Sequence, residues 1–483
     1  MTNTTEQYDV VVVGAGIAGL ASALSAHEAG ARVAVLERAP AEESGGNTRY
    51  TEAYLRMKSE DEVSADFEDS LLGDFMGYPD PGLTEELVRD RSSWPSNLKA
   101  MHILDPEVVG TFAQSAGPTL GWLRGFGVEF GPTTTGFITT STTRLAPVGG
   151  GLALVETLTE AATDRGVDFH FRTSARGLLR GDDGAVTGVT AVRADGEPVD
   201  FTGRVVLACG GFEGNAEMQA RYFGGRALVC RPIARGGYYN KGEGIEMALA
   251  AGASSAGNYS LFHAEPQDPR SSQAEPAIFV FPYGILVNLH GERFVDEAPG
   301  PADATYEAVT RVINEQPRGI GYVLLDGKID DVPTWQRAVR TDRPAIEGDT
   351  LEALAEQLEI PAETLRATVA AYNRACPDAG SFDPLRTDGL ATTDLQPEKS
   401  NWARPIDTAP YRAYPITAAN VFTFGGLKVD PQAQVVDRDG TAIRGLYAAG
   451  EIIGSYYTRY TGSTSVLKGA VFGRIAGAEA AKR

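Results

Sequence analysis

The sequence predicts an α/β protein in which a doubly wound parallel sheet is interrupted by an inserted α+β domain. Apolar runs typical of buried strands, each followed closely by glycine, lie near both ends of the chain at 8–13, 205–208 and 445–449. Between about Asn258 and Tyr411, by contrast, short strand patterns are mixed with amphipathic helical patterns. Because 483 residues exceed the usual size of one domain, we expect two.

The first domain is expected to be discontinuous, formed by residues 1–257 and 412–483, with residues 258–411 inserted as the second. In the inserted domain we expect strands at 278–281 and 285–288 and helices at 350–360 and 361–375. The chain is expected to end in a helix over 464–482, capped by Ser463 or Thr464.

Composition excludes several classes of function. The net charge of −21 is spread along the chain and would repel nucleic-acid phosphates and anionic lipid. The three cysteines, Cys209, Cys230 and Cys376, have no C-x-x-C spacing, which argues against a disulfide framework or a zinc site. The first apolar run breaks at Gly14, too early for a signal segment or a membrane span. We therefore expect a cytoplasmic protein that binds no metal, nucleic acid or membrane.

The N-terminal segment predicts a dinucleotide site. A strand at 8–13, a helix at 17–29 and a strand at 32–36 form a βαβ unit whose first turn fits G-x-G-x-x-G. Its glycines allow a tight turn, close approach of a pyrophosphate and close helix packing, and Glu37 closes the second strand where a ribose hydroxyl needs an acceptor. An acid at this position disfavours NADP. The expected binding residues here are Gly14, Gly16, Ile17, Ala18, Gly19, Glu37 and Arg38.

Later segments favour FAD over NAD. Small residues at 44–48 suit close contact with a flavin, and the Gly450-Glu451 turn suits a ribitol. The terminal helix would direct partial positive charge at the N1–C2=O side of the flavin. The sequence contains no second G-x-G-x-x-G motif, so no separate nicotinamide-binding domain is expected. The further binding residues expected are Gly45, Gly46, Asn47, Thr48, Ala175, Gly210, Gly211, Gly450, Glu451, Ser465 and Val466.

Over nearly its full length the chain resembles the flavoprotein superfamily of soluble fumarate reductases, tricarballylate dehydrogenases and 3-ketosteroid dehydrogenases. The stretches that carry the resemblance include VVVGAGIAGLASA, GGNTRYTEA, VVLACGGFEGN, GILVNLHGERFVDE, TFGGLKVDPQAQV and GLYAAGE. The resemblance implies a Rossmann-like FAD-binding domain of the GR2 type with a mobile cap, and a substrate site at their junction. No histidine lies near Asn47, where covalent members attach the flavin, so non-covalent FAD is expected.

Departures from the superfamily pattern disfavour fumarate reduction. Fumarate reductases have a histidine just before a Gly-Gly that here follows Thr423 and Phe424. An arginine of their last turn falls on Tyr460, and their proton-donor arginine has no counterpart near 301–303. Three cationic contacts to a dicarboxylate are therefore missing.

The turn from Tyr460 to Thr464 resembles the Y-P-G-P-G turn of 3-ketosteroid dehydrogenases, nearest to a desaturase of the 4-oxocyclohexanecarboxylate dehydrogenase type. The resemblance implies that the Tyr460 hydroxyl and the Thr464 N–H hold a ketone oxygen, an arrangement that would stabilise an enolate. A packed tyrosine beneath the flavin is the alternative for Tyr460. The base remains open among four residues, of which Tyr306 leads on position only: Tyr306, Asp303, Tyr283 and Tyr457.

The substrate is expected to be smaller than a steroid. Arg459, Arg144 or Arg49 could bind a carboxylate, and His263 could reach the site. The sequence thus predicts a FAD enzyme that desaturates a small cyclic ketone, such as 4-oxocyclohexanecarboxylate, by α-proton abstraction and β-hydride transfer to flavin N5. The electron acceptor stays open among dioxygen, a quinone and a carrier. The alternatives are a dehydrogenase of a tricarballylate-like acid, a 3-ketosteroid dehydrogenase and a non-catalytic flavoprotein subunit.

Overall fold

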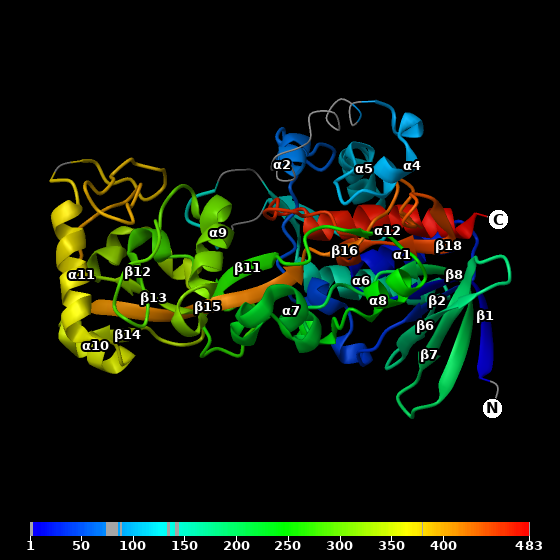
Figure 1. Cartoon of the computed structure of the whole chain (residues 1–483), viewed down its shortest axis with the longest axis horizontal. Helices are drawn as coiled ribbons and strands as arrows, with labels where there is room; N and C mark the ends of the chain where they lie inside the picture. Colours follow the sequence, from blue (N-terminus) through cyan, green and yellow to red (C-terminus); the bar gives the residue numbers. More distant parts are fainter. Residues whose placement is uncertain are drawn as a thin grey trace.

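Two sheets lie along the long axis of the molecule, and one long strand, β15 (Tyr411–Thr423), runs from one toward the other (Figure 1). The computed structural model describes residues 3–73, 86, 89–132, 136–140, 144–378 and 380–482.

The predicted N-terminal βαβ unit forms the centre of the first sheet. Strand β1 (Thr4–Val13) begins earlier than expected, helix α1 spans Ile17–Glu28, and β2 (Val33–Leu36) pairs with β1 in parallel. The sheet order is β17-β18-β8-β1-β2-β5, with β7 also pairing β8. The remaining strands are β5 (Asp168–His170), β6 (Ser174–Arg180), β7 (Val186–Val192), β8 (Pro198–Leu207), β17 (Gln434–Val436) and β18 (Ala442–Ala448).

The C-terminal helix α12 (Ser465–Ala481) packs directly on α1, so the two ends of the chain share one core. A Cβ atom at Gly473 would lie 2.4 Å from the Ala18 carbonyl oxygen, and one at Gly477 2.1 Å from that of Ser22. Glycine at both positions therefore allows the close approach. The other helices of this half are α2 (Phe67–Gly73), α4 (Ser96–Ala100), α5 (Pro106–Arg124), α6 (Gly150–Asp164), α7 (Ala216–Phe223) and α8 (Glu243–Ala250).

The second sheet has the order β11-β15-β13-β12, with β9 and β14 also pairing β15. Its strands besides β15 are β9 (Arg231–Pro232), β11 (Phe262–Gln267), β12 (Ile285–Val287), β13 (Ile320–Leu325) and β14 (Ile346–Gly348). Helices α9 (Ala302–Asn314), α10 (Leu351–Leu358) and α11 (Ala362–Ala375) accompany it. Two-stranded pairs β3 (Phe130–Pro132) with β4 (Leu145–Pro147), and β10 (Ser255–Ala256) with β16 (Gly426–Leu427), complete the strands described.

One predicted strand is wrong. Residues 278–281 form only an isolated bridge from Ile278 to Val339, and a short 3-10 turn begins at Phe281. Their side chains are nevertheless buried in an apolar core, which explains the strand-like pattern. The strand expected at 285–288 and the helices expected at 350–360 and 361–375 are confirmed as β12, α10 and α11.

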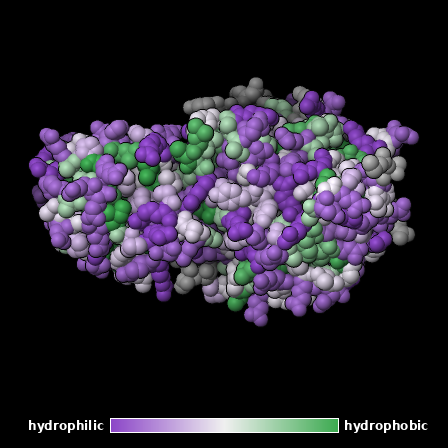
Figure 2. Space-filling model, turned by 90° about the horizontal axis from the view of Figure 1, so that it is seen from below, coloured by the Kyte–Doolittle hydropathy of each residue, from purple (hydrophilic) through white to green (hydrophobic). Residues whose placement is uncertain are grey.

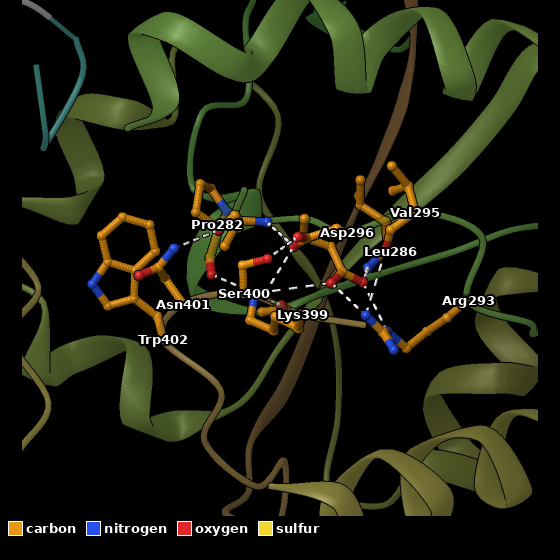
Figure 3. Close-up of polar contacts among 12 residues, drawn as sticks. Pro282, Leu286, Arg293, Val295, Asp296, Lys399, Ser400, Asn401 and Trp402 are labelled. Atoms are coloured by element: carbon orange, nitrogen blue, oxygen red, sulfur yellow. Dashed lines mark hydrogen bonds and ion pairs between the residues drawn. The ribbon is translucent and has the colours of Figure 1, made fainter. Parts of the chain in front are cut away.

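A buried charge cluster, formed by Arg293, Glu297 and Lys399, connects the segment around Lys399 to the second sheet (Figure 3). Lys399 is fully buried and donates to the carbonyl oxygens of Pro282 and Gly284 at 2.6 and 2.9 Å. Glu297 accepts from the Leu286 N–H at 2.9 Å and pairs with Arg293 at 2.7 Å. Burial lowers the pKa of Lys399 to about 8. The cluster joins three separate stretches of chain at one point.

Figure 2 shows a face on which hydrophilic residues predominate and hydrophobic ones are scattered, as expected of a chain with net charge −21. None of the helices described here is both long enough and apolar enough to cross a bilayer.

Candidate functional site

A large cavity opens where the first βαβ unit meets α12. About 1270 Å³ in this cavity and at its mouth is free of protein atoms, part of it open to solvent, which is the scale of a cofactor site. Its wall contains most of the predicted cofactor-binding residues: Gly14, Gly16, Ile17, Ala18, Glu37, Arg38, Gly45, Gly46, Asn47, Thr48, Ala175, Gly210, Gly450, Glu451, Ser465 and Val466.

The glycine-rich turn leaves space that the protein itself does not fill. Gly14 has φ of +106°, and a Cβ there would lie 2.4 Å from the Ala208 carbonyl oxygen, so this glycine is required by the turn. At Gly46 a Cβ would meet nothing within 4 Å, and at Gly16 nothing closer than 3.4 Å. The first turn of α1 carries no acidic residue, and its N-cap residue, Gly16, makes no side-chain cap. The Ile17 N–H donates to Thr48 Oγ1 at 3.1 Å, and the positive end of the helix dipole suits an anionic group such as a pyrophosphate.

Glu37 organises the same turn. One carboxylate oxygen accepts from the Ala15 N–H at 2.9 Å and the other from the Ala39 N–H at 2.8 Å. Burial raises the pKa of Glu37, while these backbone donors oppose the rise. Each oxygen retains a lone pair, so Glu37 can still accept from a ribose hydroxyl.

Two predicted cofactor residues lie outside the cavity wall. A Cβ on Gly19 would lie 1.8 Å from the Gly14 carbonyl oxygen, so Gly19 serves helix packing. A Cβ on Gly211 would lie 2.1 Å from the Glu451 side chain, so Gly211 makes room for that carboxyl group.

Glu451, a predicted residue of the cavity wall, is paired with the buried carboxyl group of Glu213, and this pairing was not predicted. Asn47 and Asn240 both donate to Glu213, and the Thr423 N–H donates to Glu451 at 2.8 Å. Burial and their mutual repulsion raise the pKa of Glu213 well above its usual value, and burial raises that of Glu451. The glutamate in the GGFEGN stretch was the available signal for Glu213.

Polar atoms in this region remain unsatisfied. Within the part of the chain that the structure describes, Asn47 Oδ1 and Glu213 Oε2 are buried without hydrogen-bond partners. Asn47 also lies in the cavity wall, where a ligand hydroxyl or N–H would satisfy it. Together with the open glycine cradle and the helix N-terminus, this atom fits a bound dinucleotide.

Lys468 is a second residue that sequence reasoning missed. It lies on α12 in the cavity wall and donates to the Ile453 carbonyl oxygen at 3.0 Å and to Ser455 Oγ at 2.7 Å. Burial lowers the pKa of Lys468 to about 7, although the nearby Glu451 opposes the shift.

A second cavity adjoins the first. About 690 Å³ in it and at its mouth is free of protein atoms, and it shares five residues with the first cavity: Thr51, Val421, Phe422, Ser465 and Val466. Its wall brings together ten residues with titratable side chains from distant parts of the chain: Glu52, Tyr54, Arg144, His263, Glu265, Glu275, Asp303, Tyr306, Arg340 and Tyr460.

Tyr460 lies at the N-terminus of α12. Its hydroxyl oxygen accepts from the backbone N–H groups of Thr464 at 3.0 Å and Ser465 at 3.2 Å. The expected side-chain cap by Ser463 or Thr464 is wrong, because the Thr464 hydroxyl donates instead to the Thr461 carbonyl oxygen. Thr464 is fully buried, and its N–H is used by Tyr460. The two groups expected to hold a carbonyl oxygen side by side are thus bonded to each other.

Only two of the four candidate bases lie at the second cavity. Tyr306 and Asp303 lie in the wall of the second cavity, whereas Tyr283 and Tyr457 do not. Tyr283 donates to the Pro384 carbonyl oxygen at 2.6 Å, and the ring of Tyr457 packs against His102. Asp303 pairs with Arg144 at 2.7 Å.

Tyr306 contacts a histidine. Its hydroxyl lies 3.1 Å from Nε2 of His263. Burial raises the pKa of Tyr306 well above its usual value, and the charge of Glu265 adds to the rise.

Of the three candidate arginines, only Arg144 lies in this wall. Its side chain is 4% exposed, and its Nε and Nη1 atoms are buried without hydrogen-bond partners among the described residues. Arg459 is exposed, and Arg49 contacts the Ser44 carbonyl oxygen and Glu156.

Comparisons with known proteins extend over the whole chain. A family model described as FAD binding domain matches residues 9–466. The vinyl phenol reductase of Lactiplantibacillus plantarum is 28% identical over 92% of this chain and 90% of its own length. The NADH:acrylate oxidoreductase of Vibrio harveyi is 28% identical over 98% of this chain, which spans only 50% of that longer protein.

Two further similarities concern ketone dehydrogenases. The 4-oxocyclohexanecarboxylate 2-dehydrogenase of Sinomonas cyclohexanicum is 30% identical over 66% of this chain and 58% of its own length. The structure of 3-ketosteroid-Δ4-(5α)-dehydrogenase from Rhodococcus jostii RHA1, solved with 4-androstene-3,17-dione, is 26% identical. It superposes over 100% of this chain and 98% of its own with a TM-score of 0.67.

Proposed function

The chain belongs to the FAD binding domain family, and from this we propose that it is a FAD-dependent dehydrogenase that desaturates a small cyclic ketone. Membership confirms the superfamily resemblance and the expected cofactor, and the solved relative confirms the α/β flavoprotein fold. The substrate and the direction of the reaction are the proposal.

The position of Tyr460 carries the proposal. Its hydroxyl is held at the N-terminus of α12, in the wall of the second cavity, where that cavity adjoins the first. Because two backbone N–H groups donate to the Tyr460 oxygen, the hydroxyl proton is left to donate, either to Ser465 Oγ or to a ligand. Hydrogen bonds in such chains strengthen one another, so this O–H suits an oxygen that gains charge in the transition state.

When bound, FAD supplies a two-electron acceptor. The glycine-rich turn, Glu37, Asn47 and the N-termini of α1 and α12 would hold it without a covalent bond. Residues 258–411 would act as the cap over the FAD-binding residues 1–257 and 412–483. The acceptor that later reoxidises the flavin is dioxygen, a quinone or a carrier.

The second cavity suits an acidic ring ketone. Tyr460 would donate to the ketone oxygen, and the two unused donor atoms of Arg144 would bind a carboxylate. Phe137, Phe279 and Phe422 supply apolar wall for a ring. Tyr306, rather than Tyr283 or Tyr457, would take the α-proton, because it alone of these tyrosines reaches the cavity. 4-Oxocyclohexanecarboxylate meets all of these requirements.

A tricarballylate-like substrate is less well supported. The wall of the second cavity offers two arginines, and both already pair with carboxylates, Arg144 with Asp303 and Arg340 with Glu52 and Glu275. Three carboxylates would lack sufficient cationic partners.

Reduction of a conjugated C=C bond is the second candidate function. It is favoured by the match to vinyl phenol reductase over 90% of that protein. The same residues would serve, with Tyr306 returning a proton instead of removing one, as microscopic reversibility requires.

Anaerobic titration of the FAD-loaded protein separates these candidates. We expect 4-oxocyclohexanecarboxylate to bleach the flavin, tricarballylate and a 3-ketosteroid to leave it oxidised, and 4-vinylphenol to leave the chemically reduced protein unchanged. Reoxidation of the reduced protein by 4-vinylphenol would establish the reductase instead. If none of the four compounds changes the flavin spectrum, both candidate functions are rejected.

A further inference from the structure

His263 occupies a position that the proposed reaction does not yet use. It lies on β11 and is 2% exposed. Its Nε2 atom faces the Tyr306 hydroxyl at 3.1 Å, and its Nδ1 atom lies 3.8 Å from Glu307 Oε2. Glu307 and Tyr306 are neighbours on α9. The imidazole therefore lies between the hydroxyl and a carboxylate, and its Nδ1 atom makes no hydrogen bond to the residues that the structure describes.

We propose that His263 is a proton relay for Tyr306: it accepts the phenolic proton while the Tyr306 oxygen takes the α-proton of the substrate. This inference rests on the proposed desaturation. His263 touches neither substrate nor flavin in this scheme and acts as a positioning residue through Tyr306.

The relay answers a difficulty in using Tyr306 as a base. A buried tyrosine whose pKa is raised is not ionised at neutral pH, so it cannot remove a proton unless it gives up its own. His263 supplies an acceptor within hydrogen-bond distance. Because the tyrosine loses one proton as it gains another, no phenolate has to be held in the buried site.

The step balances in atoms and electrons. The Cα–H bond breaks, its proton joins the Tyr306 oxygen, and the former Tyr306 proton moves to His263 Nε2, giving an imidazolium. The electron pair of the Cα–H bond becomes the π-bond of the enone. The β-hydrogen leaves with its electron pair as hydride to oxidised FAD, the two-electron oxidant.

Glu307 links this relay to the carbonyl site. Its Oε2 atom also accepts from the Tyr460 N–H at 2.9 Å, and its Oε1 atom accepts from Arg311. The ring of Tyr460 packs on that of His263, with centroids 4.4 Å apart. One carboxylate thus stabilises the imidazolium and fixes the turn that carries Tyr460.

The charges around His263 favour its protonated form. Burial alone would lower the pKa of His263, but the carboxylates of Glu265 and Glu307 raise it above its usual value. The relay needs neutral His263, so the rate should rise with pH as His263 loses its proton. The titratable and charged groups that face it are Glu265 on its own strand, Tyr306, Glu307 and Arg311 on α9, and Tyr460 before α12.

The first test measures single-turnover bleaching of the flavin by 4-oxocyclohexanecarboxylate across the neutral pH range. We expect His263→Gln to slow the step about 10²–10⁴-fold and to abolish the acid limb of the profile. Glu307→Gln should shift that limb to lower pH, because it removes a carboxylate that favours the imidazolium. Added imidazole should restore part of the rate of His263→Ala. The exposed His290→Gln is the matched control and should match wild type.

If His263→Gln is slower but keeps the wild-type acid limb, and imidazole does not rescue His263→Ala, the relay is overturned and His263 has a packing role. A second measurement does not depend on turnover. The chain has five histidines, so ring ¹⁵N signals can be assigned by substitution. Tyr306→Phe should move the His263 Nε2 signal, and Glu307→Gln should lower the pH at which it titrates. If Tyr306→Phe leaves the Nε2 signal unchanged, the relay is excluded whether or not any ketone is turned over. If Tyr306→Phe moves that signal but no substrate is turned over, only the proposed function is rejected.

Discussion

The hydroxyl oxygen of Tyr460 accepts the backbone N–H of Thr464 at 3.0 Å, so a side chain upstream of the helix caps α12. A second N–H, from Ser465, reaches the same oxygen at 3.2 Å. The helix end thereby holds the phenol in place, and the phenol in turn satisfies two donors that α12 would otherwise leave open. The cap of α12 and the proposed hydrogen bond to the ketone oxygen therefore both depend on the Tyr460 hydroxyl.

Substituting Tyr460→Phe should therefore have two effects. Loss of the cap should lower the free energy of unfolding by about 0.5–2 kcal/mol. Loss of the donor to the ketone oxygen should lower kcat by about 10²–10³-fold, with FAD retained. Thermal unfolding and flavin bleaching measure the two effects separately. Tyr457→Phe, outside the cavity wall, is the control, and unchanged turnover of Tyr460→Phe with FAD bound would remove Tyr460 from the mechanism.

Substituting Arg144→Lys tests the carboxylate site. The charge that Asp303 needs is kept, but the planar pair of donors is lost. We expect KM for 4-oxocyclohexanecarboxylate to rise about 10-fold or more, from loss of a charged hydrogen bond worth about 1.5–3 kcal/mol, while an uncharged cyclohexanone is unaffected. Arg459→Lys, at an exposed position, is the control. An equal rise in KM for both ketones would show that Arg144 does not read the carboxylate.

The charge cluster of Figure 3 predicts that removal of its carboxylate destabilises the fold more than removal of its lysine. Glu297→Ala should cost about 3–5 kcal/mol in the free energy of unfolding, because it leaves Arg293 and Lys399 buried without their carboxylate. Lys399→Met should cost less, since Arg293 still neutralises Glu297 at 2.7 Å. Denaturant unfolding measures both, with exposed Glu356→Ala as control. Equal costs would mean that the backbone contacts of Lys399, not the charge balance, hold the segment.

Lys468 predicts how stability changes with pH. Burial lowers its pKa from 10.5 to about 7, so the folded protein releases this proton at lower pH than the unfolded chain. Between about pH 7 and 10.5 the unfolded state binds more protons, and the contribution of Lys468 to stability rises with pH. Lys468→Met should therefore gain most, relative to wild type, below pH 7.

Thermal unfolding of the FAD-free protein on both sides of this range tests the prediction. Exposed Lys58→Met should differ from wild type by the same amount at every pH. A difference between Lys468→Met and wild type that does not vary with pH would show that Lys468 stays protonated in the folded protein.

The parts of the fold that the sequence predicted are those specified by local pattern. The βαβ unit, the helices at 350–360 and 361–375 and the C-terminal helix follow from periodicity and glycine placement. The strand predicted at residues 278–281 was wrong because a buried extended segment has the same apolar run as a strand that is paired in a sheet.

The site was harder to predict, because its contacts join residues far apart in the chain. His263 and Tyr306 come from a strand and a helix 43 positions apart, and nothing in their spacing brings them together. Glu213 and Glu451 meet across 238 positions for the same reason. The capping role of Tyr460 was missed because preferences at helix starts point to Ser463 and Thr464, whereas a phenol reaching forward over four residues follows no common pattern.

The path of β15 bears on how the two sheets can move relative to each other. β15 is one uninterrupted strand from Tyr411, beside β14, to Thr423, whose N–H donates to Glu451 at the cofactor cavity. Its pairing with β11 and β13 runs along most of this length, but the register with β11 shifts once, where Val421 is inserted between Asn420 and Phe422. A strand bends most readily at such an irregularity. Movement of the second sheet relative to the first would therefore be concentrated at Val421, which lies in the walls of both cavities.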